Sequence, residues 1–185
     1  YCDGLGTRVV TLYKNVAGTF VRQTTPVGGT ADFEGMSGGS LHTGDVNHDG
    51  YVDMICSGYS VIDAYRTYLY INQGNGTFVK SSASFPGVEK GQAFLFDSNN
   101  DGWLDVYVAG VGHDGSNWVW PGNLYLNNQD GTFTLTENTN LPSGTEGYAA
   151  MASGDVNNDG KTDLMVMLPN GDNTAIFYNN GDNTY

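Results

Sequence analysis

The sequence is poor in proline, in basic residues and in long apolar runs, and each shortage excludes a class of protein. Its 185 residues include 5 Pro and 7 Lys plus Arg, and the longest purely apolar run is Leu164–Leu168. A membrane-spanning helix takes about 20 apolar residues, so this run is far too short to cross a bilayer. Apolar residues also do not recur at helical spacing over ten or more residues. We therefore expect neither membrane insertion nor a long amphipathic helix.

The shortage of basic residues leaves the chain strongly acidic. Its 20 Asp and Glu against 7 Lys and Arg give a formal net charge of −13 at pH 7. Nucleic acids and anionic membrane surfaces bind basic faces, so we expect neither as a partner. Nine of the acidic residues fall in three short loops of one pattern, which indicates that part of the charge has a local purpose.

Cysteine is nearly absent. The two cysteines, Cys2 and Cys56, form a disulfide if the chain is secreted, or else remain two buried thiols. The sequence opens with Tyr1-Cys2-Asp3, without the basic start and apolar stretch of a signal peptide. This opening predicts a mature or excised segment.

Glycine and aromatic residues, in contrast, are abundant. There are 27 Gly, and Phe, Trp and Tyr make up 12% of the chain. Long stretches alternate apolar with polar residues, as the two faces of a half-buried strand require. We therefore expect many short strands joined by tight glycine turns, which places the chain in the all-β class.

An acidic loop occurs three times in the sequence. Residues 45–53, 97–105 and 155–163 share the pattern Asp-x-Asn-x-Asp-Gly-x-x-Asp. A second motif, in which Thr precedes an aromatic residue in a turn, recurs in phase and ends at Phe20, Phe78, Phe133 and Tyr185. Each copy follows a strand-like run, and the four runs are Thr7–Tyr13, Thr67–Asn72, Asn123–Asn127 and Thr174–Asn179. These pairs predict hairpins.

One repeat therefore predicts four antiparallel strands: one that enters the acidic loop, one that leaves it, and the two strands of the hairpin. Four-stranded units of this length, stacked around an axis, are the blades of a β-propeller. We predict one propeller segment with a half blade at 1–33 and blades at 34–85, 86–142 and 143–185. Closed propellers have roughly four to eight blades, so these three and a half are incomplete. The chain is expected either to be cut from a longer propeller or to be completed by another chain, in a ring or a filament.

The acidic loop has the donor pattern of a calcium site. Ca²⁺ takes about six to eight oxygen ligands, and alternate residues of a tight loop can aim their oxygens at one point. We predict that the first, third, fifth and ninth residues bind through side chains and the seventh through its backbone carbonyl. The three predicted sites are Asp45, Asn47, Asp49, Tyr51 and Asp53; Asp97, Asn99, Asp101, Trp103 and Asp105; and Asp155, Asn157, Asp159, Lys161 and Asp163.

Other interpretations of the loop fit less well. An EF-hand needs Glu as its twelfth residue, where this chain has Cys56, Val108 and Val166. No thiolate or imidazole occupies a ligand position, which disfavours zinc and copper, and the crowded carboxylates disfavour magnesium. A metal-free turn rich in Asp and Asn is the alternative. Three copies in register favour metal, because clustered carboxylates repel one another without a cation.

The acidic loop, repeated in phase with the predicted blade, resembles the FG-GAP/VCBS repeat family, whose calcium loops also occur in the propellers of integrin α-subunits. The resemblance covers about residues 34–185, together with the half blade around residues 7–23. It implies a secreted or cell-surface protein. Such a protein would serve adhesion or the binding of carbohydrate or protein, or would accompany a polysaccharide-active enzyme.

A ligand-binding face is expected at the end of the blades opposite the acidic loops. In antiparallel blades, the connections between the second and third strands lie at that end. Here the middle blade carries two Trp with His and Asp, the blade before it carries two Tyr, and flat rings of this kind stack on the CH faces of sugars. The candidate ligand residues are His113, Asp114, Trp118, Trp120, Tyr59 and Tyr65. The alternative is that the two Trp pack against a neighbouring blade.

No catalytic motif accompanies these features. The sequence has no nucleophile elbow, P-loop or zinc motif, so we do not expect an enzyme. The principal expectation is a non-catalytic extracellular module in which three Ca²⁺ stiffen the blades. The alternatives are a self-assembling structural subunit and an accessory propeller of a polysaccharide-degrading enzyme.

Overall fold

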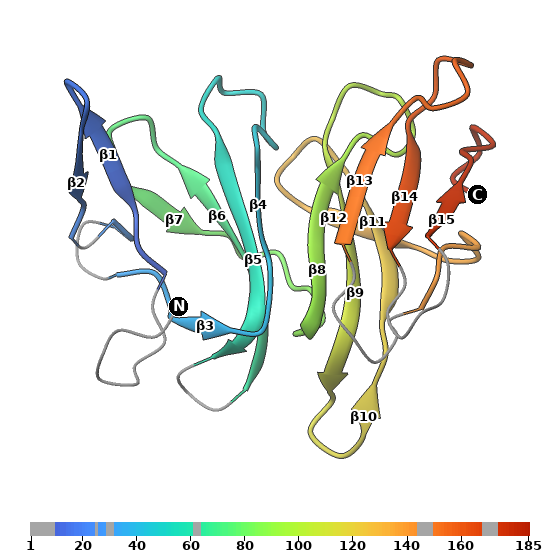
Figure 1. Ribbon diagram of the computed structural model, residues 1–185, viewed down its shortest axis with the longest axis horizontal. Helices are drawn as coiled ribbons and strands as arrows, with labels where there is room; N and C mark the ends of the chain where they lie inside the picture. The colour runs from blue at the N-terminus through green and yellow to red at the C-terminus, as the bar shows by residue number, and fades with distance from the viewer. Residues whose placement is uncertain (1–9, 25, 29–31, 61–63, 144–149, 168–173) are drawn as a thin grey trace.

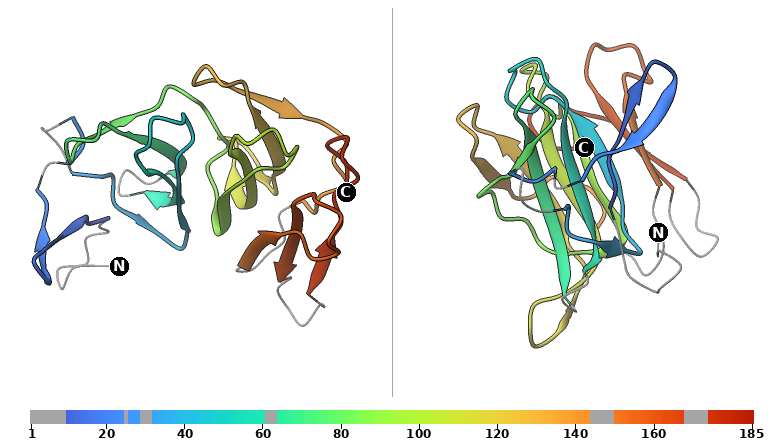
Figure 2. Two further views of the ribbon diagram at one scale, coloured as in Figure 1. Left: turned by 90° about the horizontal axis from the view of Figure 1, so that it is seen from above. Right: turned by 90° about the vertical axis from the view of Figure 1, so that its left-hand side faces the viewer.

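The computed structural model describes residues 10–24, 26–28, 32–60, 64–143, 150–167 and 174–185. Every regular element in these ranges is a β-strand, and no helix long and apolar enough to cross a membrane occurs in them. The strands form separate antiparallel sheets that stand side by side (Figure 1), and from above the sheets fan around an open arc (Figure 2). This is the all-β, incomplete propeller that the repeat predicts.

The first complete blade lies within residues 34–85. Its strands are β3 (Met36–Ser37), β4 (Leu41–Gly44), β5 (Asp53–Ser60), β6 (Tyr65–Asn72) and β7 (Phe78–Lys80). Both β3 and β4 pair with β5, so the strand that enters the acidic loop is in two pieces. β5 then pairs with β6, and β6 with β7. β5 is buried along nearly its whole length, as a strand covered on both faces must be.

The second blade, within residues 86–142, repeats this order. β8 (Glu89–Phe96) pairs with β9 (Asp105–His113), β9 with β11 (Gly122–Asn127), and β11 with β12 (Phe133–Thr136). The additional strand is β10 (Trp118–Val119), which pairs with the end of β9. It extends this blade at the end opposite the acidic loops (Figure 1).

The two ends of the fan are shorter. In the third blade, β13 (Ala150–Gly154), β14 (Asp163–Met167) and β15 (Ala175–Phe177) form one sheet, and residues 178–185 form a turn rather than a fourth strand. At the other end, β1 (Tyr13–Val16) pairs with β2 (Thr19–Arg22).

The first hairpin strand lies later than predicted, because β1 begins at Tyr13, the last residue of the predicted run Thr7–Tyr13. The two turn residues, Ala17 and Gly18, both have positive φ, at 50° and 87°. A two-residue turn of this kind continues the strand up to Val16. Of the predicted strand, residues 7–9 lie outside the described residues.

The Thr-aromatic motif closes the same turn in three blades. In the first blade, the Gln73 amide donates to the Thr77 carbonyl at 2.9 Å. The equivalent bonds, each at 3.0 Å, join Asn128 to Thr132 and Asn180 to Thr184. The aromatic residue that follows packs into or against a hydrophobic cluster, a different one in each blade: Phe78, Phe133 and Tyr185. The motif is therefore both a hairpin turn and a core anchor.

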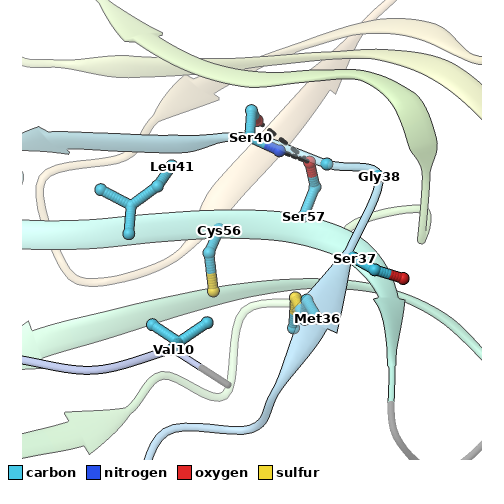
Figure 3. Close-up of a pocket in the computed structure, with 9 residues that line it drawn as sticks. Val10, Met36, Ser37, Gly38, Ser40, Leu41, Cys56 and Ser57 are labelled. Atoms are coloured by element: carbon cyan, nitrogen blue, oxygen red, sulfur yellow. Dashed lines mark hydrogen bonds between the residues drawn. The ribbon is translucent and has the colours of Figure 1, made fainter. Parts of the chain in front are cut away.

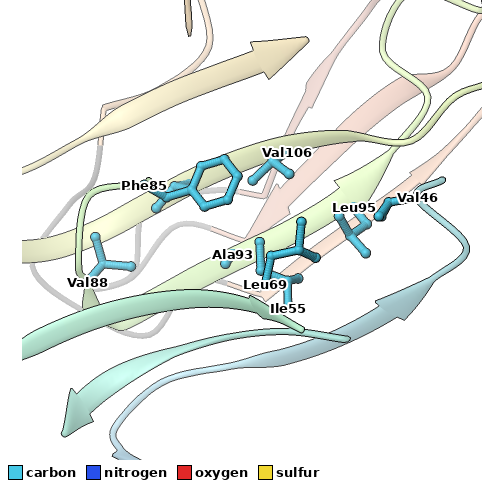
Figure 4. Packing of buried hydrophobic residues seen from close by; sticks show 9 residues of the cluster. Val46, Ile55, Leu69, Phe85, Val88, Ala93, Leu95 and Val106 are labelled. Atoms are coloured by element: carbon cyan, nitrogen blue, oxygen red, sulfur yellow. The ribbon is translucent and has the colours of Figure 1, made fainter. Parts of the chain in front are cut away.

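Apolar cores join the blades to one another. The cluster between the first two blades includes Ile55 and Leu69 from the first and Leu95 and Val106 from the second (Figure 4). Full burial of one such side chain stabilises the fold by about 1.5–3 kcal/mol. A second cluster joins the second and third blades, with Leu164 as one of its fully buried members. The blades are thus held by packing between sheets.

A glycine bulge interrupts the strand that enters the acidic loop. In the second blade, the pairing of β8 with β9 shifts register between Glu89 and Gln92. Gly91 approaches β9 so closely that an added Cβ would lie 2.0 Å from the Ala109 carbonyl oxygen. At Gly39 in the first blade, an added Cβ would lie 1.8 Å from a carbonyl oxygen of β5. The glycine there lies between β3 and β4, where the strand is broken.

Cys56 of β5 lines a small hollow beside this bulge. The hollow has a volume of about 200 Å³ and is also bordered by Val10, Met36 and Leu41 (Figure 3). The Cys56 side chain is 2% exposed and carries a free thiol, whereas Cys2, its predicted disulfide partner, lies outside the described residues. Burial raises the pKa of the Cys56 thiol to about 12. The thiol therefore stays protonated at neutral pH.

We expect Cys56 to resist thiol-reactive reagents until the protein unfolds. A Cys2→Ser variant keeps Cys56 as its single cysteine. Near neutral pH the folded variant should not react with Ellman's reagent, because the thiolate is the reacting species. In guanidinium chloride the same sample should release one equivalent per chain. Rapid reaction of the folded variant would show that Cys56 is accessible.

Candidate metal centres

The three acidic loops connect β4 to β5, β8 to β9 and β13 to β14, and they all lie at one end of the sheets (Figure 1). Their backbones turn in the same way. The fourth residues have positive φ: His48 59°, Asn100 58° and Asn158 62°. So do the sixth residues: Gly50 85°, Gly102 89° and Gly160 84°. A left-handed φ favours glycine at the sixth position.

The same hydrogen bonds hold the first, third and fifth residues of each loop. In the first loop, Asp45 Oδ2 accepts from the Gly50 amide at 2.9 Å. Asn47 Oδ1 accepts from the Asp49 amide at 3.1 Å, and Asp49 Oδ1 accepts from the Tyr51 amide at 2.8 Å. The equivalent acceptors are Asp97, Asn99 and Asp101 in the second loop and Asp155, Asn157 and Asp159 in the third. Backbone amides thus fix three predicted ligands around every turn.

The ninth residue of each loop is buried beneath the turn. Asp53, Asp105 and Asp163 are each 0% exposed. Asp105 Oδ2 accepts from the Ser98 amide at 3.0 Å and from the Ser98 hydroxyl, and its Oδ1 accepts from the Asn127 amide at 2.8 Å. In the other blades, the corresponding amides belong to Val46 and Asn72 for Asp53, and to Val156 and Asn179 for Asp163.

The ninth Asp therefore has a structural role that sequence reasoning missed. It ties the acidic loop to the third strand of the same blade or to the residue just past that strand. A carboxylate offers about four lone-pair sites, so two or three hydrogen bonds leave room for the predicted contact with a cation.

Burial also makes two of these carboxylates, Asp53 and Asp105, costly to ionise. Desolvation is the main cause that raises the pKa of Asp53 and of Asp105, and the backbone hydrogen bonds oppose it. Neighbouring carboxylates add to the increase, Asp49 and Asp45 for Asp53, and Asp101 for Asp105. A cation in the loop would offset this repulsion.

The donors of the loop suit a hard cation that prefers oxygen. Within the described residues, no three His, Cys, Asp or Glu side chains form a metal cluster by themselves. A site in these loops therefore depends on Asn and carbonyl oxygens as well as on carboxylates. In the first loop, Asp45 Oδ1 is buried and has no hydrogen-bond partner. A buried carboxylate oxygen without a donor is unfavourable, and a bound Ca²⁺ would satisfy it. The residues of the first loop thus fit the ion that the sequence predicts.

The third loop carries a positive charge of its own. Lys161 Nζ lies 3.1 Å from Asp159 Oδ2 in a partly exposed ion pair. The pKa of Asp159 is lowered first by the hydrogen bond from the Lys161 amide and next by the Lys161 side chain. Lys161 therefore offsets part of the negative charge of this loop.

The fourth residue of a loop contacts the next loop, which sequence reasoning did not anticipate. The ring of His48 stacks on Trp103, with centroids 3.9 Å apart and planes at 17°. His48 Nε2 lies 3.0 Å from the Gly102 carbonyl oxygen. In the following loop, Asn100 takes this role and donates to the Gly160 carbonyl. The three turns are therefore linked in series along one end of the sheets.

A buried Asn forms a second link between blades. Asn127 Nδ2 donates to the Val46 carbonyl of the first loop at 2.8 Å and to the Leu104 carbonyl of its own loop at 3.0 Å. Asn179 Nδ2 repeats this with the Ser98 carbonyl at 2.6 Å and the Thr162 carbonyl at 3.1 Å. A signal was present in the sequence, because Asn ends three of the four strand-like runs. Its partners across the blades were not readable there.

Replacing Asn127 with alanine should destabilise the protein by about 2–3 kcal/mol, because two carbonyls lose their donor in a buried place. Urea denaturation measures the loss. The matched control is Asn128→Ala, since Asn128 is exposed and bonds within its own hairpin. The control should change stability by less than about 1 kcal/mol. Equal losses in the two variants would show that Asn127 does not link the blades.

At the opposite end of the sheets, a hollow lies between the first two blades, which we call the interblade hollow. Five of the six predicted ligand residues line it: Tyr59, Tyr65, His113, Asp114 and Trp118. Its volume is about 480 Å³. The sixth, Trp120, is 43% exposed and is not among the lining residues. The ligand residues predicted from the sequence therefore come from both blades, and the fold places five of them around one space.

Antiparallel blades, three of which carry their own copy of the acidic-loop motif, define this chain as a β-propeller-type repeat module. The FG-GAP-like repeat family matches residues 59–108 and 97–166, which together make up more than half of the sequence. The chain belongs to the FG-GAP-like repeat family. Among curated proteins, a search found no sequence that matches it.

Proposed function

We propose that this chain is a non-catalytic, calcium-binding β-propeller module of a secreted or cell-surface protein. Each acidic loop holds one Ca²⁺, and the ions stiffen the blades for binding a glycan or a protein. One observation carries the proposal: the three loops present the same oxygens in the same hydrogen-bonded turn, and in the first of them Asp45 Oδ1 is buried without a donor.

The links between loops support a stiffening role. His48 and Asn100 join each turn to the next, and Asn127 and Asn179 join each third strand to the loop of the preceding blade. The positive charge of Ca²⁺ would draw the exposed carboxylates of a loop together. Order imposed on one loop would then reach the adjacent blade through these side chains.

Thermal unfolding in Ca²⁺ and in EDTA tests the proposal. A ligand at about a hundred times its Kd adds roughly 2.7 kcal/mol for each site. For a chain of this size, each kcal/mol shifts Tm by about 2–4 °C. Saturating Ca²⁺ should therefore raise Tm by more than about 10 °C, and an equal concentration of Mg²⁺ should do much less. Identical unfolding curves in Ca²⁺ and EDTA would contradict the proposal.

Self-assembly is the second candidate function, and exposed apolar side chains favour it. They gather on the two ends of the fan, where Phe20 of the first hairpin is 70% exposed and Met167 of the third blade is 56% exposed. Tyr13, Ile176 and Tyr178 add to the same two faces. Apolar faces of this kind mark contacts with other protein surfaces. We propose that further blades or another copy of the chain cover them.

Light scattering during size-exclusion chromatography in Ca²⁺ distinguishes the two kinds of cover. Self-assembly predicts a mass that rises with protein concentration, and Phe20→Glu should reduce it because the change charges one end of the fan. A monomer at every concentration would exclude assembly of this chain with itself.

A further inference from the structure

We propose that the interblade hollow binds a neutral saccharide. The site rests on the proposed function, because calcium-stiffened blades would supply its two walls. One wall comes from Tyr59 at the end of β5 and from Tyr65 and Arg66 at the start of β6. The other comes from His113 at the end of β9 and Trp118 in β10, at the end of the sheets away from the acidic loops (Figure 1).

The apolar part of the hollow is a chain of aromatic rings that crosses from one blade to the other. The Tyr59 and Tyr65 centroids are 5.1 Å apart, and those of Tyr65 and Trp118 are 5.8 Å apart with the planes at 67°. Trp118 remains 53% exposed despite this contact. Its indole therefore keeps apolar surface on which the CH face of a pyranose ring can stack.

A tight turn holds Trp118 in place. Asp114 Oδ1 accepts from the Ser116 and Asn117 amides at 2.8 and 2.7 Å, and the Asp114 amide donates to the Asn117 carbonyl at 3.1 Å. Trp118 follows directly and pairs with His113 in the β9–β10 ladder. The aromatic wall is thus formed before a ligand arrives, which lowers the cost of binding.

Polar groups border the rings, as a hydroxyl-rich ligand requires. His113 Nδ1 accepts from the Gly115 amide at 3.0 Å, so the neutral ring carries its proton on Nε2 and can donate from that atom. Arg66 Nη1 donates to the Tyr65 carbonyl at 3.0 Å, and the Arg66 side chain also hydrogen-bonds the Tyr68 side chain. A guanidinium has about five N–H donors, so these bonds leave donors for a ligand. Asp114 adds carboxylate oxygens. Planar donors and acceptors beside aromatic faces suit the hydroxyls of a sugar.

The charge of the lining favours a neutral ligand. Among the lining residues, Arg66 and Asp114 carry opposite charges. The remainder of the chain is acidic, with a formal charge of −13, so a polyanionic glycan would be repelled. The volume, about 480 Å³, lies within the range of small-molecule pockets. A proline-rich peptide also uses aromatic grooves, but it would leave the polar side chains of this hollow largely unpaired.

The test uses the whole chain in Ca²⁺. The probes are glucose, galactose, mannose, N-acetylglucosamine and their β-linked disaccharides, and binding is followed by saturation-transfer NMR and tryptophan fluorescence. We expect at least one neutral sugar to bind. Trp118→Ala should raise its Kd about tenfold, because one stacking ring is lost. The matched control, Trp120→Ala, should leave Kd within about twofold, since Trp120 does not line the hollow.

A second variant keeps the test clear of folding effects. Arg66→Met removes the donors and leaves the rings, and it should also raise Kd. The inference is overturned if no neutral sugar binds, if only glucuronate or oligoproline binds, or if Trp118→Ala and Arg66→Met leave Kd unchanged. The Ca²⁺-dependent rise in Tm is measured on the same samples. If that rise persists while sugar binding fails, only the saccharide site is lost; if both fail, so does the proposed function.

Discussion

Replacing Asp105 with alanine is expected to destabilise the calcium-free protein by about 3–5 kcal/mol. The Asp105 carboxylate is 0% exposed and accepts from the amides of Ser98 and Asn127. Its removal leaves two backbone donors without an acceptor, and each buried unsatisfied donor costs about 1–3 kcal/mol. Urea denaturation in EDTA measures the effect. Asp105→Asn, which keeps one acceptor oxygen, should fall between the two proteins.

The matched control is Asp101→Ala in the same loop. Asp101 is exposed, and its side chain accepts from the Trp103 amide of its own turn at 2.8 Å and from the Gln129 side chain at only 3.5 Å. In EDTA this variant should lose less than about 1 kcal/mol. In Ca²⁺ it should lose the stabilisation that its loop supplies. If the two alanine variants were equally stable in EDTA, the buried hydrogen bonds of Asp105 would not stabilise the fold as we expect.

Replacing Gly91 with alanine is expected to cost about 3 kcal/mol or more. The added Cβ would lie 2.0 Å from the Ala109 carbonyl oxygen, so β8 would have to move away from β9 and weaken their pairing. Forcing extra atoms into a packed core, with the backbone shifts that follow, costs typically about 1–3 kcal/mol and occasionally more. Thermal and urea unfolding both report the loss.

Gly154→Ala is the control for this change. Gly154 ends β13, the corresponding strand of the third blade, and an added Cβ there would meet no atom within 4 Å. We expect a change of less than about 1 kcal/mol. A Gly91→Ala protein as stable as the control would show that the bulge can open without cost.

The features that could be predicted from the sequence are those carried by local pattern. The acidic loops and the Thr-aromatic turns are each complete within a short segment, so their repetition identified the blades and the end at which the loops lie. The aromatic residues of the interblade hollow were also predictable. Tyr59 lies near the end of the second strand of one blade, Trp118 follows the second strand of the next, and repeat geometry places such positions side by side.

The features that the sequence did not reveal depend on partners in another strand or blade. The ninth residue of each loop is Asp, a residue type that binds metal ions. Only the fold shows that its oxygens accept from amides at or just past the third strand. In the sequence, Asn127 is only the last residue of a strand, and the fold shows that it donates to the Val46 carbonyl. In the sequence, Gly91 resembles any glycine in a strand, and the fold shows how closely the Ala109 carbonyl approaches it. In each case, the residue type permits several roles and a contact across the sheet selects one.

The two ends of the sheets carry different groups. One end carries the oxygen-rich loops, linked in series by His48 and Asn100. The other carries the interblade hollow, whose walls come from two blades. Because the same sheets join both ends, stiffening by Ca²⁺ would preserve the spacing of the hollow without a direct contact between ion and ligand.

Isothermal titration of the metal-free chain with Ca²⁺ tests the central proposal most directly. The three loops predict three bound Ca²⁺ for each chain. They also predict two for Asp101→Ala, which alters one loop and leaves the buried Asp105 in place. Absence of Ca²⁺ binding, or the same stoichiometry in the wild-type chain and in Asp101→Ala, would contradict it.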